Sequence, residues 1–294
     1  MDTHTPIIKD ENKDAKNNTI QSPKKFRKRN KIRSDKQKMS WISKVKDIKL
    51  IRKDPFGNFL FLKRMLVGVL GAATYPRFNI LNKTEVEGAE HLINLPNKNV
   101  MFISNHQTYF ADVMVMYHVF CSVKWKLKNI NFPVYLLNPR TKMFYVAAEE
   151  TMKDGGWLPR LLAYTGAVTI KRSWRAKGEE VQRGADTSAP NKIKQALAEG
   201  WVVTFPQGTT KAFAPVRKGS AHLIHELKPI VVPVYINGFR RAFDKKGFFL
   251  KKRGTKLQVT FKKPVQFTDE HSIADIQKFI EKHVKLPEEM QTVK

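Results

Sequence analysis

A histidine and an aspartate six positions apart form the segment of this chain best suited to proton-transfer chemistry. His106 follows the apolar run at residues 99–104, and Asp112 opens a second apolar stretch. A histidine accepts protons near neutral pH, and a carboxylate on its other ring nitrogen fixes the tautomer and stabilises the imidazolium. The pattern therefore indicates a general base and its orienting partner. The alternative is a loop histidine followed by an aspartate that only caps a helix.

Two further polar segments follow apolar runs. Residues 166–172 end in Lys171 and Arg172, and an arginine can hold phosphate oxygens through two parallel hydrogen bonds. The alternative there is an edge strand that presents charge to water. The residues after the run at 201–206 are Gln207, Gly208, Thr209, Thr210 and Lys211. Glycine permits close backbone approach and its neighbours supply donors, although the segment alone is typical of a turn.

The elements that must position these segments alternate between strands and helices. Runs rich in Val, Ile, Thr and Phe predict strands at residues 99–104, 167–172, 201–206, 230–236 and 256–265. Helical periodicity predicts helices at residues 112–121, 190–199 and 272–285, the last with Ser272 as its cap. Nearly all-apolar strands between helices indicate an α/β fold, with a mostly parallel sheet flanked by helices. Ligands bind at the carboxyl ends of such strands, where the three polar segments lie.

Four of these blocks stand in the order and spacing of a known family. The blocks NHQTYFAD, GAVTIKR, FPQGTT and IVVPV, spread over roughly residues 80–265, resemble the glycerolipid acyltransferase family, which includes the lysophosphatidic acid acyltransferases. The resemblance implies a 1-acylglycerol-3-phosphate O-acyltransferase-like enzyme of phospholipid biosynthesis, which moves a fatty acyl group from acyl-CoA or acyl carrier protein to a lysophospholipid hydroxyl. It implies His106 as general base and Asp112 as its partner, with no metal, cofactor or covalent intermediate. Lys171 and Arg172 would hold the acceptor's phosphate, and residues 207–211 would shape its pocket.

The chain departs from the family's pattern at three places. Five residues separate His106 from Asp112, where the family usually has four, and a loop can absorb the extra residue as a bulge. Gln207 stands where the family has Glu, and Thr210 where it has Arg. Losing that arginine removes a fork for phosphate, for which Lys211 is a substitute. The acceptor's identity therefore stays open.

The composition restricts the class of protein and of partner. The chain has 294 residues, 41% of them hydrophobic, which is enough for one large domain with an appendage. Its net charge of +28 predicts polyanionic partners, either nucleic acid or phospholipid surfaces and phosphorylated substrates. A single cysteine, Cys121, excludes an intrachain disulfide. Two alternatives to the enzyme are a basic nucleic-acid-binding protein, for which no RNA-binding or DNA-binding motif is evident, and a non-catalytic lipid-binding relative.

The sequence predicts three parts. Residues 1–38 lack apolar periodicity and an export signal, which predicts a disordered basic arm. Residues 39–78 hold a basic amphipathic stretch and an apolar run too short and too charged to span a bilayer, which predicts membrane-docking helices. Residues 79–294 would form the acyltransferase domain. We expect a protein attached to the cytoplasmic face of the membrane, partnered by anionic lipid and not nucleic acid, with residues 239–264 forming a basic hairpin toward lipid or coenzyme A phosphates.

Overall fold

The computed structural model of the protein describes residues 52–153, 156–171, 175–176, 179–180 and 186–284. The predicted basic arm and the amphipathic stretch that begins at Trp41 lie outside these residues. The apolar run that the sequence shows within residues 39–78 is the helix Leu60–Asn79.

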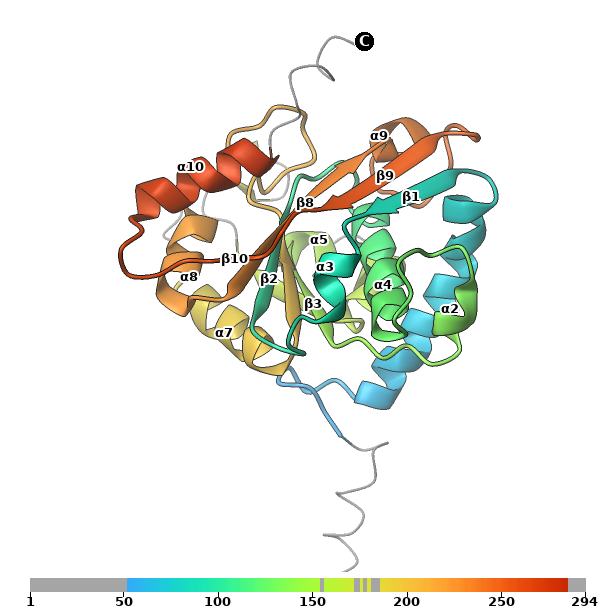
Figure 1. The fold of residues 1–294 in the computed structure, drawn as a ribbon. Helices are drawn as coiled ribbons and strands as arrows, with labels where there is room; N and C mark the ends of the chain where they lie inside the picture. The colour runs from blue at the N-terminus through green and yellow to red at the C-terminus, as the bar shows by residue number, and fades with distance from the viewer. Residues whose placement is uncertain (1–51, 154–155, 172–174, 177–178, 181–185, 285–294) are drawn as a thin grey trace, which may run out of the picture. The chain divides into compact units, whose positions relative to one another are not determined.

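The centre of the domain is a sheet of eight strands (Figure 1). Its strands are β1 (Lys83–Glu87), β2 (Val100–Ser104), β3 (Met143–Ala148), β4 (Ala167–Ile170), β7 (Trp201–Thr204), β8 (Ile230–Asn237), β9 (Lys256–Phe261) and β10 (Val265–Gln266). The order is β1-β9-β8-β2-β7-β3-β4, with β10 paired to β8. Among the described strands of this sheet, only the pairings of β8 with β9 and β10 are antiparallel. The predicted mostly parallel sheet is therefore confirmed.

Helices cover both faces of the sheet (Figure 1). They are α2 (Leu60–Asn79), α3 (Glu90–Ile93), α4 (Ala111–Lys124), α5 (Glu149–Lys153), α6 (Trp157–Ala163), α7 (Ala189–Glu199), α8 (Gly219–Leu227), α9 (Phe239–Ala242), α10 (Ile273–Val284) and the 3-10 turn η1 (Pro133–Leu136). The helices α2, α3 and α4 pack on one face, and α7, α8 and α10 on the other. Short strands β5 (Arg175–Ala176) and β6 (Glu179–Glu180) form a separate antiparallel pair.

Two predicted elements differ from the structure. The strand predicted at residues 256–265 is two strands, β9 and β10, because Pro264 has no N–H for the ladder and ends the pairing. Of the basic hairpin predicted at residues 239–264, the structure has only an antiparallel bridge between Phe243 and Leu250. The rest of this stretch is the short helix α9, loop segments and β9. Ser272 caps α10 as predicted, since its Oγ accepts a hydrogen bond from the Asp275 amide at 3.2 Å.

Alternating residues of β2 enter two separate hydrophobic cores. Val100 and Phe102 face the helices α2 and α4, whereas Met101 and Ile103 face α7, α8 and α10. Phe102 lies 4.5 Å from the Phe120 ring of α4, measured between ring centroids, and all of β2 is buried. A strand held on both faces is rigid, so the loop that leaves its carboxyl end starts from a fixed point.

A buried polar network attaches α2 to the rest of the domain. His118 of α4 lies 3.0 Å from the Thr74 hydroxyl of α2 through Nε2, and 3.0 Å from the Tyr135 hydroxyl through Nδ1. The Thr74 hydroxyl itself donates to the Leu70 carbonyl at 2.8 Å, so it accepts from Nε2–H. Burial lowers the pKa of His118 to about 3, which means that the ring is neutral wherever the protein is folded at ordinary pH.

This network predicts an acid-sensitive fold. The unfolded chain binds a proton at His118 below pH about 6.5 and the folded chain does so only near pH 3, so stability is lost as the pH falls through this window. We expect His118 to account for about 3 kcal/mol of unfolding free energy between pH 7 and pH 4. Urea denaturation of the wild type and His118→Gln at both pH values measures the difference. Equal acid sensitivity in the two proteins would contradict this assignment.

Candidate active site

The loop after β2 is fastened to the end of β8 by two buried amide side chains. Asn105 donates to the Ile236 carbonyl and accepts from the Ile236 amide, both at 2.8 Å. Gln107 donates to the same carbonyl at 3.1 Å and accepts from the Arg240 amide at 3.1 Å. These bonds hold the backbone on both sides of His106. Sequence reasoning did not assign either amide a role, although both lie in the block that contains the histidine.

His106 and Asp112 form a hydrogen-bonded pair. The distance from His106 Nδ1 to Asp112 Oδ2 is 2.8 Å. Asp112 is fully buried in the first turn of α4, and it also accepts from the backbone amides of Gln107 at 2.6 Å and Thr108 at 3.0 Å and from the Thr108 hydroxyl at 2.8 Å. Four donors and the amino end of a helix stabilise a negative carboxylate there.

The pairing assigns separate tasks to the two ring nitrogens of His106. A carboxylate accepts hydrogen bonds, so Nδ1 carries the proton and Nε2 carries a lone pair. Nε2 makes no hydrogen bond to any residue that the structure describes, and the side chain is 12% exposed. The ring is stacked on Phe205, with centroids 3.9 Å apart. The imidazole is therefore held on one side and available to a proton donor on the other.

The loop accommodates the extra residue between His106 and Asp112 before the helix starts. The amides of Tyr109 and Phe110 bond to the carbonyls of residues 245 and 246 at 3.1 and 2.9 Å. Gly247 closes this contact with a φ of +85°, and a Cβ atom there would lie 2.5 Å from the Ala111 amide nitrogen. The bulge brings the two side chains together despite their unusual spacing.

The turn after β7 forms the facing wall. Gly208 has a φ of +64°, and Gln207 donates from its side chain to the Ala214 carbonyl at 2.8 Å. The Thr209 hydroxyl accepts from the Lys211 amide at 3.3 Å. Thr210 is buried, and its carbonyl accepts a hydrogen bond from Arg240 Nη2 at 2.7 Å.

These walls enclose a cavity of about 150 Å³. His106, Gln207, Lys211, Phe213 and Arg240 are among its lining residues, and no carboxylate lines it among the described residues. A base, two cations and an aromatic side chain in one cavity suit a ligand that carries both an anionic group and an apolar part.

Lys171, one of the predicted phosphate-binding residues, is not among the residues that line this cavity. Lys171 follows β4, an edge strand that is separated from β2 by β3 and β7, or about 14 Å at the usual strand spacing. Its side chain is exposed and its amide bonds to Asp186 at 2.9 Å. Arg172 lies outside the described residues. Sequence reasoning noted Arg240 only as part of a basic stretch and missed its place beside His106.

The comparisons with known proteins identify the family of this chain. The family model described as Acyltransferase matches residues 83–237, which is more than half of the chain and runs from β1 to the end of β8. The chain belongs to this acyltransferase family, which confirms the resemblance drawn from the four sequence blocks and makes the protein an acyltransferase. No curated protein sequence matches the chain significantly.

One solved structure similar to this chain is the 1-acyl-sn-glycerophosphate (LPA) acyltransferase PlsC from Thermotoga maritima. The two sequences are 20% identical over 79% of this chain and 80% of that chain, and the TM-score is 0.45.

Proposed function

We propose that this acyltransferase moves a fatty acyl group from a thioester to the hydroxyl of a lysophospholipid, with His106 as general base and Asp112 as the residue that positions it. The observation that carries the proposal is the 2.8 Å bond between His106 Nδ1 and the buried Asp112, beside a cationic cavity. This arrangement leaves Nε2 free to accept a hydroxyl proton.

The reaction follows from these positions. His106 Nε2 takes the acceptor's hydroxyl proton while the hydroxyl oxygen bonds to the thioester carbonyl carbon. The carbon–sulfur bond then breaks, and the departing thiolate takes the proton from the imidazolium. Asp112 stabilises the imidazolium between these steps, because its carboxylate is fixed by three further donors.

The acceptor's phosphate is assigned to Arg240 and Lys211. Thr210 stands where the family usually has arginine, and the Arg240 guanidinium contacts the carbonyl of this same residue. Arg240 therefore supplies a cation at the position where the pattern lacks one, and its remaining N–H groups can bind phosphate oxygens. With these two cations, the cavity has the positive charge that the phosphate of a lysophosphatidate-like acceptor needs.

Arg240→Gln tests the acceptor assignment. We expect KM for lysophosphatidate to rise by roughly 10- to 100-fold with a smaller change in kcat, because charge-assisted hydrogen bonds to the bound phosphate are lost. Turnover of a monoacylglycerol, which has no phosphate, should change much less. The neighbouring exposed Arg241→Gln is the control. Equal effects of Arg240→Gln on the two acceptors would contradict a phosphate contact.

The activity itself is tested with purified protein and an acceptor panel. Palmitoyl-CoA is mixed with lysophosphatidate, lysophosphatidylglycerol or monoacylglycerol, and the thiol and the acylated lipid are measured. We expect thiol release that depends on a phosphate-bearing acceptor. A parallel reaction with palmitoyl-carrier protein identifies the donor. Absence of acylated lipid with every donor and acceptor would favour the non-catalytic lipid-binding alternative.

We also propose that α2 places the enzyme on an anionic membrane surface. Phe61, Leu62, Met65 and Val69 are exposed on this helix, Met65 by 51% and Val69 by 64%. None of the helices in the described residues is long and apolar enough to cross a bilayer. An apolar face with basic residues nearby is typical of a helix that lies in the headgroup layer.

Substitution of the apolar face tests this attachment. We expect Met65→Gln with Val69→Gln to reduce flotation on vesicles of phosphatidylglycerol and phosphatidylcholine several-fold, because about 25 cal/mol is lost for each Å² of apolar surface that no longer leaves water. Turnover of a short-chain, water-soluble acceptor should stay unchanged. Wild-type flotation by the double variant would show that α2 does not dock.

A further inference from the structure

A second cavity lies at the amino ends of the central strands, whereas His106 follows the carboxyl end of β2. Its volume is about 410 Å³, and its lining includes residues at or just before the starts of β2, β3 and β7, while the catalytic loops follow their ends. Six cations and one acid, Glu199, line it, and the cations are Arg52, Arg64, Lys98, Lys124, Arg140 and Lys142. The length of β2 alone puts about 13 Å between this cavity and the loop that carries His106.

An ion pair or the helix dipole accounts for two of the six cations, Lys142 and Lys124, and a third, Arg140, lies 4.5 Å from the centroid of the Trp125 ring. Lys142 pairs with Glu199 at 3.1 Å, and Lys124 lies in the last turn of α4, where the helix dipole favours a positive charge. Lys124 also lies 3.8 Å from the centroid of the Trp201 ring. The side chains of the other four cations make no ion pair within the described part of the chain. Gathering like charges in one hollow is unfavourable unless an anion occupies it.

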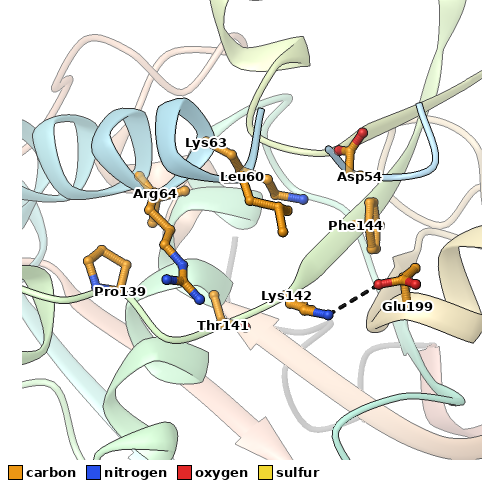
Figure 2. Close-up of a pocket in the computed structure, with 10 residues that line it drawn as sticks. Asp54, Leu60, Lys63, Arg64, Pro139, Thr141, Lys142, Phe144 and Glu199 are labelled. Atoms are coloured by element: carbon orange, nitrogen blue, oxygen red, sulfur yellow. Dashed lines mark hydrogen bonds and ion pairs between the residues drawn. The ribbon is translucent and has the colours of Figure 1, made fainter. Parts of the chain in front are cut away.

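A buried hydroxyl in the same cavity gives an independent indication of a ligand. Thr141 is 8% exposed, and its Oγ1 has no hydrogen-bond partner among the described residues. Figure 2 shows Thr141 beneath the Arg64 guanidinium and next to Lys142, which is joined to Glu199. Thr141 also lines the narrower adjoining cavity drawn there. Buried polar groups almost always have a partner, and a ligand in the cavity that this residue lines would bring an acceptor close to the hydroxyl.

The electrostatics of the cavity agree with this. Burial, and then the nearby Lys126, lower the pKa of Lys124 to about 8, so the empty site already disfavours its positive charge. A bound anion would offset the effects of burial and of Lys126 on the pKa of Lys124. Arg64 and Arg140 offer planar forks for phosphate oxygens, and the hydroxyl of Thr141, which follows Arg140 in sequence, offers a neutral donor.

We infer that this cavity is a second anion site, which binds a phosphate-bearing ligand away from the catalytic centre. The phosphate comes either from a soluble phosphorylated molecule or from the headgroup of an anionic lipid, since both present the same oxygens. The inference does not depend on the acyl acceptor, because the two sites lie at opposite ends of the central strands.

Pyrophosphate and short-chain phosphatidate below its micelle concentration are the two probes. Calorimetric titration of the full chain, carrying His106→Ala so that catalysis plays no part, measures their affinities in low salt. We expect Arg64→Gln and Thr141→Val each to weaken binding roughly tenfold. The control is Lys262→Gln, which removes one exposed charge outside the cavity and should leave the affinity within twofold. Binding of pyrophosphate alone identifies a soluble ligand, and binding of phosphatidate alone identifies a lipid headgroup.

Thr141→Val separates a binding role from a structural one. Removal of an unpaired buried hydroxyl should leave the thermal midpoint of the free protein unchanged or higher, while the anion affinity falls. The inference is overturned if neither probe binds, or if Arg64→Gln and Thr141→Val bind both probes as tightly as the control. It is also overturned if Thr141→Val lowers the midpoint of the free protein by several degrees, because the hydroxyl would then have a structural partner.

Discussion

Replacement of His106 by alanine is expected to lower kcat/KM for acyl transfer by about a thousandfold while the protein stays folded. The loss is large because Nε2 is the group placed to accept the acceptor's proton. The fold should survive because Asp112 keeps its hydrogen bonds from two backbone amides and the Thr108 hydroxyl. Initial rates of thiol release, measured with acceptor present, give the effect, and the thermal midpoint reports folding.

A matched variant controls for the loss of a histidine. His222 of α8 is exposed and lies outside the cavity, so His222→Ala should keep the wild-type rate. A His106→Ala protein that retained more than about a tenth of the wild-type rate would remove His106 from the role of general base.

Asp112→Asn is expected to produce the other large loss, between about a hundredfold and ten thousandfold in kcat. Asp112 Oδ2 accepts from His106 and from two backbone amides, and Oδ1 accepts from the Thr108 hydroxyl, so an amide group turns its NH2 toward a donor in either orientation. In both orientations the imidazole loses the negative partner that stabilises its charged form. We also expect a fall of about 1 to 3 kcal/mol in unfolding free energy, because a buried donor is left unpaired.

Rates and stability together decide how Asp112 acts. Activity is measured at a temperature where urea denaturation shows Asp112→Asn to be folded, and exposed Asp269→Asn serves as the control. A loss confined to kcat agrees with a positioning role. If the folded variant turned over at the wild-type rate, the pair would be structural only.

The central strands could be predicted from sequence because their whole surface is buried. In β2, β7 and β8 nearly every residue is apolar, so a short run of Val, Ile and Phe is enough to locate each to within two residues. The edge strand β1 has the sequence KTEVE and carries no such signal. It is a strand because it pairs along its full length with β9, which begins 169 residues after its own last residue, and local propensity does not report that pairing.

Site residues that are neighbours in sequence could be predicted. Residues that the order of the strands brings to the site, or keeps away from it, could not. His106, Asp112 and residues 207–211 follow strands that are adjacent in the sheet, so their blocks meet. Lys171 follows a strand of the same type, but the sheet places that strand at its edge. Arg240 reaches the cavity through β8 and α9, and its amide contacts a glutamine 133 residues away. No local pattern encodes either fact.

The second cavity is even harder to predict from the sequence than the catalytic site. Its six cations come from five separate segments, each of which carries one or a few unremarkable basic residues, and only the fold collects them at the amino ends of the strands. The net charge predicted a polyanionic partner, but it did not show where on the protein that partner binds.

The most direct test of the central claim is the stoichiometry of transfer by the purified protein. Deuterium-labelled palmitoyl-CoA and lysophosphatidate are incubated with the enzyme, and free thiol and labelled phosphatidate are measured together by absorbance and mass spectrometry. Direct attack by the activated hydroxyl predicts equal amounts of the two products, very little thiol without lysophosphatidate, and no palmitoylated protein at any time. Thiol released at the full rate without the acceptor, or a labelled acyl group on the protein itself, would contradict the account.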